Sequence, residues 1–246
     1  MITAKDIASM IDHSMLQPYM TNAEVGRGCE VALRYHTASV CARPDDMATV
    51  VRELKGSGIP ACTVIGFPHG SVRADVKLYE AQRALDEGVE ELDMVINIGR
   101  LRAGEDGYVR DDIAAIVNAA HSANAIVKVI LENCFLTREE IERACRICCD
   151  VHADFVKTST GYGKYGAKLR DLIVMRDSIT PDVRIKAAGG IRTLDMALLC
   201  RHIGCSRCGA SATEAIMQET LRREAEGTLI EKTAEELQAA LAVETY

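Results

Sequence analysis

The sequence predicts an α/β fold and, within that class, a single (β/α)8 TIM barrel. Short apolar runs rich in Val and Ile alternate with longer helical patterns along the whole chain. No linker rich in Pro, Gly or Ser interrupts this alternation, and eight of the runs have the character of strands. A length of 246 residues suits one barrel of this kind. We therefore expect one domain spanning residues 1–246.

The predicted strands are mostly apolar, as expected for strands that are buried on both faces of a parallel sheet. They lie at 11–16, 38–43, 61–67, 91–98, 126–132, 153–159, 183–190 and 206–211. Parallel strands are joined by right-handed helical crossovers, and eight such units fit a closed barrel better than an open sheet. An open doubly wound sheet is the alternative.

Helix signals fill the intervals between these strands. Predicted N-cap residues are Asn22, Thr137 and Thr213. Glu140 follows Thr137 by three residues, which is the spacing of a capping box. Gly88 and Gly204 stand where helices should end, because glycine readily adopts the left-handed conformation of a helix C-terminus.

The composition argues against a nucleic-acid or membrane partner. The formal net charge is −7, whereas binding to nucleic acid or anionic lipid depends on clustered Lys and Arg. No apolar run is long enough to span a bilayer, and the first residues lack the apolar stretch of a signal peptide. We expect a cytoplasmic protein that meets any anionic substrate at a local site.

Ten cysteines favour a reducing compartment, where they serve as small buried apolar residues. Two CxxC pairs, Cys145 with Cys148 and Cys205 with Cys208, allow a zinc or redox site as an alternative. Neither pair is accompanied by a His or acidic cluster of the kind that completes such sites, so no metal is expected.

Four predicted strands carry an ionisable residue inside an apolar run. These residues are Asp93, Lys128, Lys157 and Lys186, on the fourth to seventh strands. Neighbouring strands lie about 4.8 Å apart, so inward-pointing side chains at similar heights would form one charged cluster. A purely structural set of buried ion pairs is the alternative, because such networks also occur without chemistry.

Three ammonium groups cannot all be neutralised by one aspartate. Two of them about 4 Å apart repel by about 4 kcal/mol at an effective dielectric constant near 20, which favours loss of one proton. A lysine that has lost its proton is a nucleophile, so this pattern predicts covalent catalysis by a lysine.

The segment KTSTG at 157–161 places Lys157 at the end of a strand, and there the chain resembles the deoxyribose-phosphate aldolases. Further matching segments occur in the order and spacing of that family over nearly the whole chain. They are IDHSML, VCARP, IGFPHG, ELDMVINIG, VKVILE, IKAAGGIRT and GAS.

The resemblance implies a class I, Schiff-base mechanism with defined catalytic roles. Lys157 would form the imine, and Lys186 would favour the neutral form of that lysine. Asp93 would move protons, held in place by Lys128. Some family members end in a tyrosine that assists proton transfer, and Tyr246 is the last residue of this chain.

The substrate residues follow from the same resemblance and from the usual position of a phosphate in such barrels. Asp12 and Ser14 would orient the substrate hydroxyls. A phosphate in an α/β barrel typically lies between the loops after the seventh and eighth strands. Those loops contain Gly189, Gly190, Gly209 and Ser211.

The chain departs from the family in two places near these residues. The loop at 163–168 reads GKYGAK, with Lys164, Tyr165 and Lys168 where many relatives have smaller residues. Ala212 stands where a second serine is common. The lysines could strengthen an anion site by their charge, or Tyr165 could reshape the loop for another polyol aldehyde.

The implied reaction is the reversible retro-aldol cleavage of 2-deoxy-D-ribose 5-phosphate to D-glyceraldehyde 3-phosphate and acetaldehyde, without metal or organic cofactor. An aldolase of the same fold acting on another sugar or sugar phosphate is one alternative, and a non-catalytic phosphosugar-binding barrel is another. The partner expected is a small sugar phosphate, and a homodimer or higher homo-oligomer is expected because barrels of this sort commonly associate.

Overall fold

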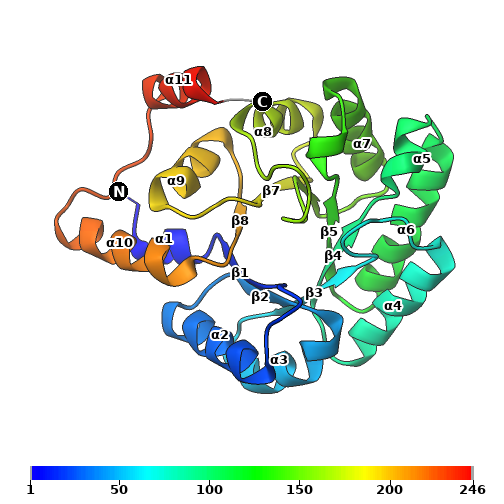
Figure 1. The fold of residues 1–246 in the computed structure, drawn as a ribbon, viewed down its shortest axis with the longest axis horizontal. Helices are drawn as coiled ribbons and strands as arrows, with labels where there is room; N and C mark the ends of the chain where they lie inside the picture. The colour runs from blue at the N-terminus through cyan, green and yellow to red at the C-terminus, as the bar shows by residue number, and fades with distance from the viewer. Residues whose placement is uncertain (1, 245–246) are drawn as a thin grey trace.

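The computed structural model describes residues 2–244, and eight parallel strands in this range close into a barrel (Figure 1). Each strand lies within one of the eight segments predicted from the sequence. They are β1 Ile11–Met15, β2 Ser39–Ala42, β3 Ala61–Ile65, β4 Glu91–Val95, β5 Ile126–Ile130, β6 Phe155–Lys157, β7 Arg184–Ala188 and β8 Arg207–Ala210. The predicted (β/α)8 barrel is confirmed.

Strand pairing follows chain order around the barrel, and β8 pairs with β1 to close it. A closed ring excludes the open doubly wound sheet that was the alternative. The register brings charged residues together, because Asp93 lies opposite Lys128 on the neighbouring strand and Lys157 lies opposite Lys186. Registered residues of parallel strands face the same side of the sheet, so these pairs share the barrel interior.

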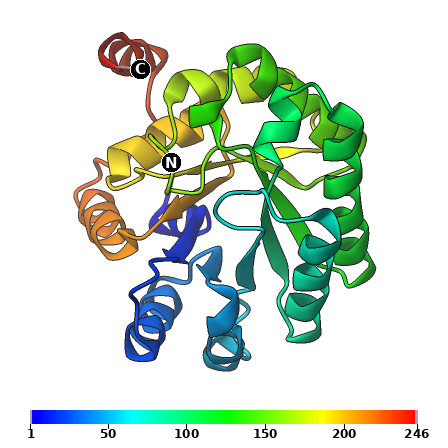
Figure 2. The ribbon, with the colours of Figure 1, turned by 45° about the vertical axis from the view of Figure 1, so that its right-hand side comes forward.

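Helices surround the barrel, as the two views in Figures 1 and 2 show. They are α1 Ala4–Ala8, α2 Asn22–Tyr35, α3 Met47–Leu54, α4 Ala74–Asp86, α5 Ile98–Arg102, α6 Asp106–Ser122, α7 Arg138–Asp150, α8 Leu169–Ser178, α9 Leu194–Ile203, α10 Thr213–Ala225 and α11 Ala234–Val243, with 3-10 turns η1 Pro44–Asp46 and η2 Asn133–Phe135. α11 lies outside the ring. It is tied to α8 through Glu244, whose carboxylate accepts from the backbone N–H groups of Leu169 and Arg170.

The helix boundaries confirm one predicted cap and correct two. Thr137 caps α7 and forms the predicted capping box with Glu140. The cap of α2 is Thr21, one residue before the predicted Asn22.

Thr213 is the first residue of α10, and the cap position before it belongs to Ala212. The Thr213 hydroxyl is not available for capping, since it donates to the carbonyl of Ala210 and bonds the ring of His13. At the C-termini, Gly204 caps α9 in the left-handed conformation and Gly88 follows the cap of α4, as predicted.

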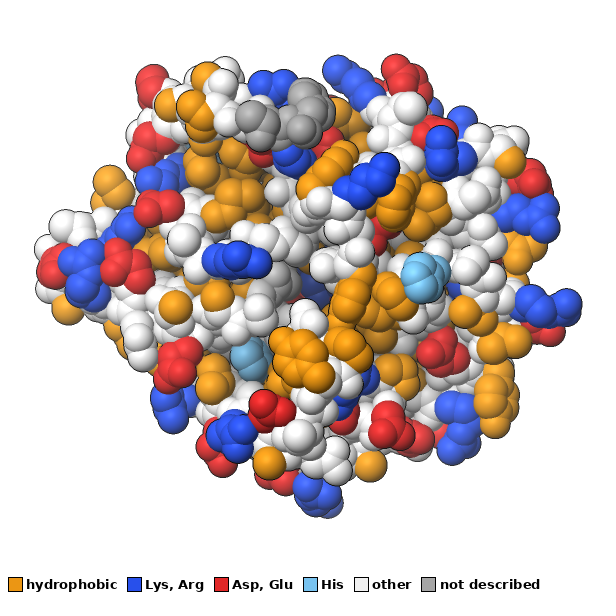
Figure 3. All heavy atoms as spheres, viewed as in Figure 1, with side chains coloured by type: hydrophobic (Ala, Val, Ile, Leu, Met, Phe, Trp, Pro, Cys, Tyr) orange, Lys and Arg blue, Asp and Glu red, His pale blue; other side chains and the backbone are white. Residues whose placement is uncertain are grey.

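The core fills the barrel and the layer between barrel and helices, and both CxxC pairs belong to it. Cys145, Cys148, Cys205 and Cys208 are buried among apolar residues. Burial raises the pKa of Cys145 and Cys148, which suits their role as apolar packing residues. Within residues 2–244, no helix combines the length and apolarity needed to cross a membrane. Charged side chains of both signs are interspersed around the rim of the face in Figure 3.

Candidate active site

The four ionisable residues predicted to cluster do meet inside the barrel. The carboxylate of Asp93 accepts from Lys128 at 2.8 Å through Oδ1, and from Lys157 at 2.6 Å and Lys186 at 2.7 Å through Oδ2. All four side chains are buried, and even Lys157 is only 3% exposed. A single Asp93 oxygen is therefore shared by Lys157 and Lys186, which brings their two ammonium groups into close proximity.

Three further charged residues join this cluster, so the expected ratio of three lysines to one carboxylate is wrong. Asp12 contacts Lys186 at 2.5 Å and Arg207 at 2.5 Å, and Glu91 contacts Lys128 at 2.6 Å and Arg207 at 3.0 Å. We call the following seven residues the charged cluster: Asp12, Glu91, Asp93, Lys128, Lys157, Lys186 and Arg207. It holds four cationic side chains and three carboxylates, so one positive charge remains unbalanced when all are ionised.

The ion pairs fix the charge of most members of the cluster. Burial alone would raise the pKa of Asp93, but the three ammonium groups around it hold that pKa well below its usual value. Burial alone would lower the pKa of a lysine, but Asp12 and Asp93 raise the pKa of Lys186, and Asp93 above all raises that of Lys128. Lys128 and Lys186 therefore stay charged at neutral pH.

Lys157 has the fewest anionic partners of the three lysines. Within the described chain, Lys128 pairs with three carboxylates, Lys186 with two and Lys157 with Asp93 alone. If one lysine of the cluster loses a proton and so removes the surplus positive charge, the fewest ion pairs are lost when that lysine is Lys157. The geometry thus favours the same lysine that the KTSTG segment indicated.

The residues after Lys157 are held by polar contacts to the neighbouring strands. The Thr158 hydroxyl donates to the carbonyl of Ala188 and accepts from its N–H, both at 3.0 Å, which continues the pairing of β6 with β7. The carboxylate of Glu132 accepts from the backbone N–H and the hydroxyl of Thr160. Sequence reasoning did not assign Glu132, although it is a charged residue at the end of a predicted apolar strand.

A pocket of about 170 Å³ opens over Lys157, at the ends of β1, β6, β7 and β8. Five predicted substrate-binding residues line it, namely Ser14, Gly189, Gly190, Gly209 and Ser211. Arg192 also lines it and was not predicted, although it is part of the GGIRT segment. A larger hollow of about 710 Å³, lined in part by Arg52 and Lys55, contains none of the predicted site residues.

Asp12 does not line this pocket, which corrects the expectation that it contacts substrate hydroxyls. Its side chain is fully buried and bonds Lys186 and Arg207. Asp12 thus acts on the site through Lys186. Tyr246, the candidate for proton transfer, lies outside the described residues.

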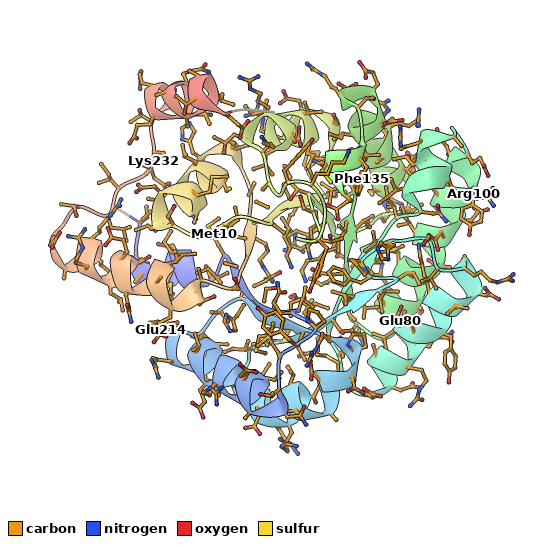
Figure 4. The ribbon with its side chains drawn as sticks, in the orientation of Figure 1. Met10, Glu80, Arg100, Phe135, Glu214 and Lys232 are labelled. Carbon is orange, nitrogen blue, oxygen red and sulfur yellow. The ribbon has the colours of Figure 1, made fainter. Side chains whose placement is uncertain are left out.

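The unusual loop at 163–168 turns its long side chains away from the pocket. The ammonium group of Lys164 lies 5.7 Å from the ring centre of Phe135, which Figure 4 labels in η2, and that of Lys168 lies 5.0 Å from the ring centre of Tyr165. Neither lysine lines the pocket, so the expectation that they add charge to an anion site is not supported.

Two thiols face the charged cluster. Cys41 and Cys62 are registered partners on β2 and β3, and their sulfur atoms and an oxygen of Asp93 all lie within 4.8 Å of one another. These residue types can ligate a metal ion, but both oxygens of Asp93 already accept from ammonium groups. The surplus positive charge of the cluster also disfavours a cation here.

Comparisons with known proteins agree with this geometry. The family model described as "DeoC/LacD family aldolase" matches residues 7–218. Deoxyribose-phosphate aldolase from Rhodopirellula baltica is 43% identical over 89% of this chain and 90% of its own length, and that from Thermococcus gammatolerans is 43% identical over 87% and 96%. The solved structure of the tetrameric enzyme of that name from Aeropyrum pernix superposes with a TM-score of 0.82 at 29% identity, covering 93% of this chain and 94% of its own.

Proposed function

This chain belongs to the DeoC/LacD family of aldolases, and from that premise we propose that it cleaves 2-deoxy-D-ribose 5-phosphate reversibly to D-glyceraldehyde 3-phosphate and acetaldehyde. The observation that carries the proposal is the position of Lys157. It is a buried lysine at the end of β6, it pairs with a single carboxylate, and it borders a pocket.

The first half of the reaction is formation of an imine. The neutral amine of Lys157 adds to the carbonyl carbon of the open-chain aldehyde, and the resulting carbinolamine loses water. Asp93 is the proposed proton carrier for these steps, because its Oδ2 lies 2.6 Å from Nζ of Lys157. Lys128 and Lys186 hold that carboxylate in place through ion pairs of 2.8 and 2.7 Å.

The second half breaks the carbon–carbon bond. The protonated imine accepts the electron pair of the bond between the second and third carbon atoms, while the hydroxyl on the third carbon loses its proton and becomes the aldehyde of glyceraldehyde 3-phosphate. The enamine left on Lys157 is then protonated at carbon, and hydrolysis releases acetaldehyde and the free amine. These steps need acid–base groups and water.

The phosphate is proposed to bind between the loops after β7 and β8. Gly189 and Gly190 have left-handed backbones, with φ of 82° and 83°, so a side chain on either residue would be strained. α10 begins at Thr213, and Ala212 at its N-cap position makes no side-chain capping bond, which leaves the first N–H groups of the helix available to an anion beside Ser211. Arg192 adds a positive charge to the same wall of the pocket.

Gly166→Ala is expected to lower kcat/KM by about 10- to 100-fold, because small displacements of substrate-positioning groups are costly. A Cβ on Gly166 would lie 2.1 Å from the carbonyl oxygen of Gly189 and would push apart the loops after β6 and β7. Gly107→Ala is the matched control, since a Cβ there meets nothing within 4 Å. Steady-state kinetics with deoxyribose 5-phosphate test this, and equal values for both variants would contradict it.

Several broader expectations belong to the same proposal. We propose a single domain over residues 1–246, a homodimer or higher homo-oligomer, and a cytoplasmic location. The tetramer described for the Aeropyrum pernix relative supports association, and ten free cysteines suit a reducing compartment.

The proposal is tested by borohydride trapping with acetaldehyde or deoxyribose 5-phosphate, followed by peptide mass mapping. We expect a two-carbon adduct on Lys157 and none on the exposed Lys164 of the following loop. An adduct on Lys128 or Lys186 would keep the Schiff-base chemistry and overturn the assignment of the nucleophile. Absence of any adduct would reject the substrate, and the same trapping with other sugar phosphates would then test the alternative aldolase.

A further inference from the structure

Two members of the charged cluster, Arg207 and Glu91, lie deeper in the barrel than the pocket. They are the first residues of β8 and β4, and neither lines the pocket. The Arg207 guanidinium donates to Asp12 at 2.5 Å and to the two oxygens of Glu91 at 3.0 and 3.3 Å. A group in this position cannot touch the substrate, so any effect on the reaction must pass through other residues.

Continuous ion pairs connect these two residues to Lys157. From Arg207 the contacts run through Asp12 to Lys186, which shares Oδ2 of Asp93 with Lys157. From Glu91 they run through Lys128 to the other oxygen of Asp93. Burial keeps water from screening these charges, so a change at one end is felt at the other.

Arg207 supplies the unbalanced positive charge of the cluster. Without it, three lysines face three carboxylates, and all three lysines can keep their protons at electrical neutrality. With it, the seven residues carry one surplus positive charge, which favours loss of a proton from one lysine, and Lys157 has the fewest carboxylate partners among the ion pairs. Glu91 acts in the opposite sense, because removing its charge would leave two surplus positive charges.

We propose that Arg207 and Glu91 are positioning residues that set the protonation of Lys157 from deeper in the barrel, outside the pocket. Arg207 favours the neutral amine of Lys157, and Glu91 favours its ammonium form. This inference rests on the proposed function. Lys157 is registered with Lys186 on the next strand, and Lys186 is registered with Arg207 on the strand after that. Lys157 and Arg207 are therefore two strands apart, a distance of about 10 Å. A unit charge at that distance and an effective dielectric constant near 20 shifts a titration by about one pH unit.

Three other titratable groups face the cluster and must be considered. Cys41 and Cys62 lie beside Asp93, and burial raises the pKa of Cys62 well above its usual value. Glu132 follows β5, and burial raises the pKa of its carboxyl group. All three are unchanged in the variants compared below, so they do not alter the sign of a difference between variants.

The test measures the pH dependence of imine formation with acetaldehyde, trapped by cyanoborohydride and quantified at Lys157 by mass spectrometry. On the acidic side of this pH profile, imine formation falls as Lys157 becomes protonated, and we call this part of the curve the acid limb. Arg207→Gln should move the acid limb to higher pH by about one unit, because the ammonium form of Lys157 becomes more favourable. Glu91→Gln should move it in the opposite direction, to lower pH, because loss of the carboxylate makes the ammonium form of Lys157 less favourable. The double variant R207Q/E91Q restores the surplus of one positive charge and should return the limb close to its original pH, as should the charge-preserving Arg207→Lys.

Opposite shifts in the two single variants, and their cancellation in R207Q/E91Q, would show an effect of charge. General damage to the fold would not return the pH midpoint of imine formation to its original value in the double variant. Thermal melting identifies any variant that does not fold, and Glu91→Gln, with the same shape as the native residue, still tests the sign if Arg207→Gln fails. Shifts in the same direction, or none, would overturn the inference. No adduct on Lys157 in the unmodified protein would overturn the proposed function as well, whereas a normal adduct with unshifted variants overturns the inference alone.

Discussion

Lys157→Arg is expected to abolish imine formation and to lower kcat by at least about 10⁴-fold, as loss of a covalent nucleophile does in other enzymes. Arginine keeps the positive charge that Asp93 binds at 2.6 Å, so the ion pairing of the cluster survives. A guanidinium does not lose its proton in proteins and cannot act as the nucleophile. The variant thus separates the chemistry of the amine from its charge.

Lys164→Arg is the matched control for this prediction. Lys164 lies on the loop that follows Lys157, but it is exposed, stacks on Phe135 and does not line the pocket. Its substitution should leave kcat and the adduct on Lys157 unchanged. Retro-aldol activity in Lys157→Arg within tenfold of the unmodified protein would show that another lysine forms the imine, and peptide mapping of that variant would identify it.

The strands could be predicted from the sequence because their signal is local. Each buried strand is an apolar run that needs no knowledge of its neighbours, and all eight runs form strands of the barrel. The first residue of each helix was harder to predict, because it depends on which of several neighbouring polar side chains caps the helix. Thr21 and Asn22 both have capping side chains, and only the backbone conformation decides that Thr21 is the cap.

The charged cluster could be predicted only in part, for a physical reason. A charge in the middle of an apolar run, such as Asp93 or Lys128, is conspicuous. Glu91 and Arg207 begin their strands, where charged residues usually face solvent, so they gave no such signal. Their burial follows from long-range pairing, since Arg207 lies 195 residues from Asp12 along the chain.

The role of Asp12 illustrates the same limit. The family resemblance placed Asp12 near the substrate. It lies two residues before Ser14 on β1, and Ser14 lines the pocket. Which side chain of β1 reaches the pocket depends on the depth of each residue in the barrel, and the sequence does not contain that depth. The expectation that one lysine loses its proton likewise rested on an incorrect count of three lysines to one carboxylate, whereas the ion pairs in the structure give four cationic side chains and three carboxylates.

Asp93→Asn is expected to destabilise the protein and to impair catalysis. Removing one partner of a buried ion pair leaves uncompensated charge and costs about 3 to 5 kcal/mol of unfolding free energy. Asp93 balances three lysines, so a loss at the upper end of that range is expected. Loss of the proposed proton carrier should lower kcat by a further factor of about 10² to 10⁴.

The pH dependence of this loss has a definite sign. The pKa of Asp93 is held well below its usual value by the surrounding lysines, so its contribution to stability is present above pH about 4 and is lost as pH falls through the lower pKa of the folded state. The difference in unfolding free energy between the native protein and Asp93→Asn should therefore be largest near neutral pH and should shrink in acid. Denaturant titrations at a series of pH values measure it.

Asp112→Asn separates the effect on stability from the effect on catalysis. Asp112 pairs with Lys77 at 2.6 Å, and this pair is as buried as those of the charged cluster but joins α4 to α6 outside the pocket. Its loss should cost a comparable 3 to 5 kcal/mol while kcat, measured below the melting transition, stays within a few-fold of the native value. If Asp112→Asn lowered kcat as much as Asp93→Asn, the loss in both would reflect a loosened barrel, and Asp93 would no longer be supported as the proton carrier.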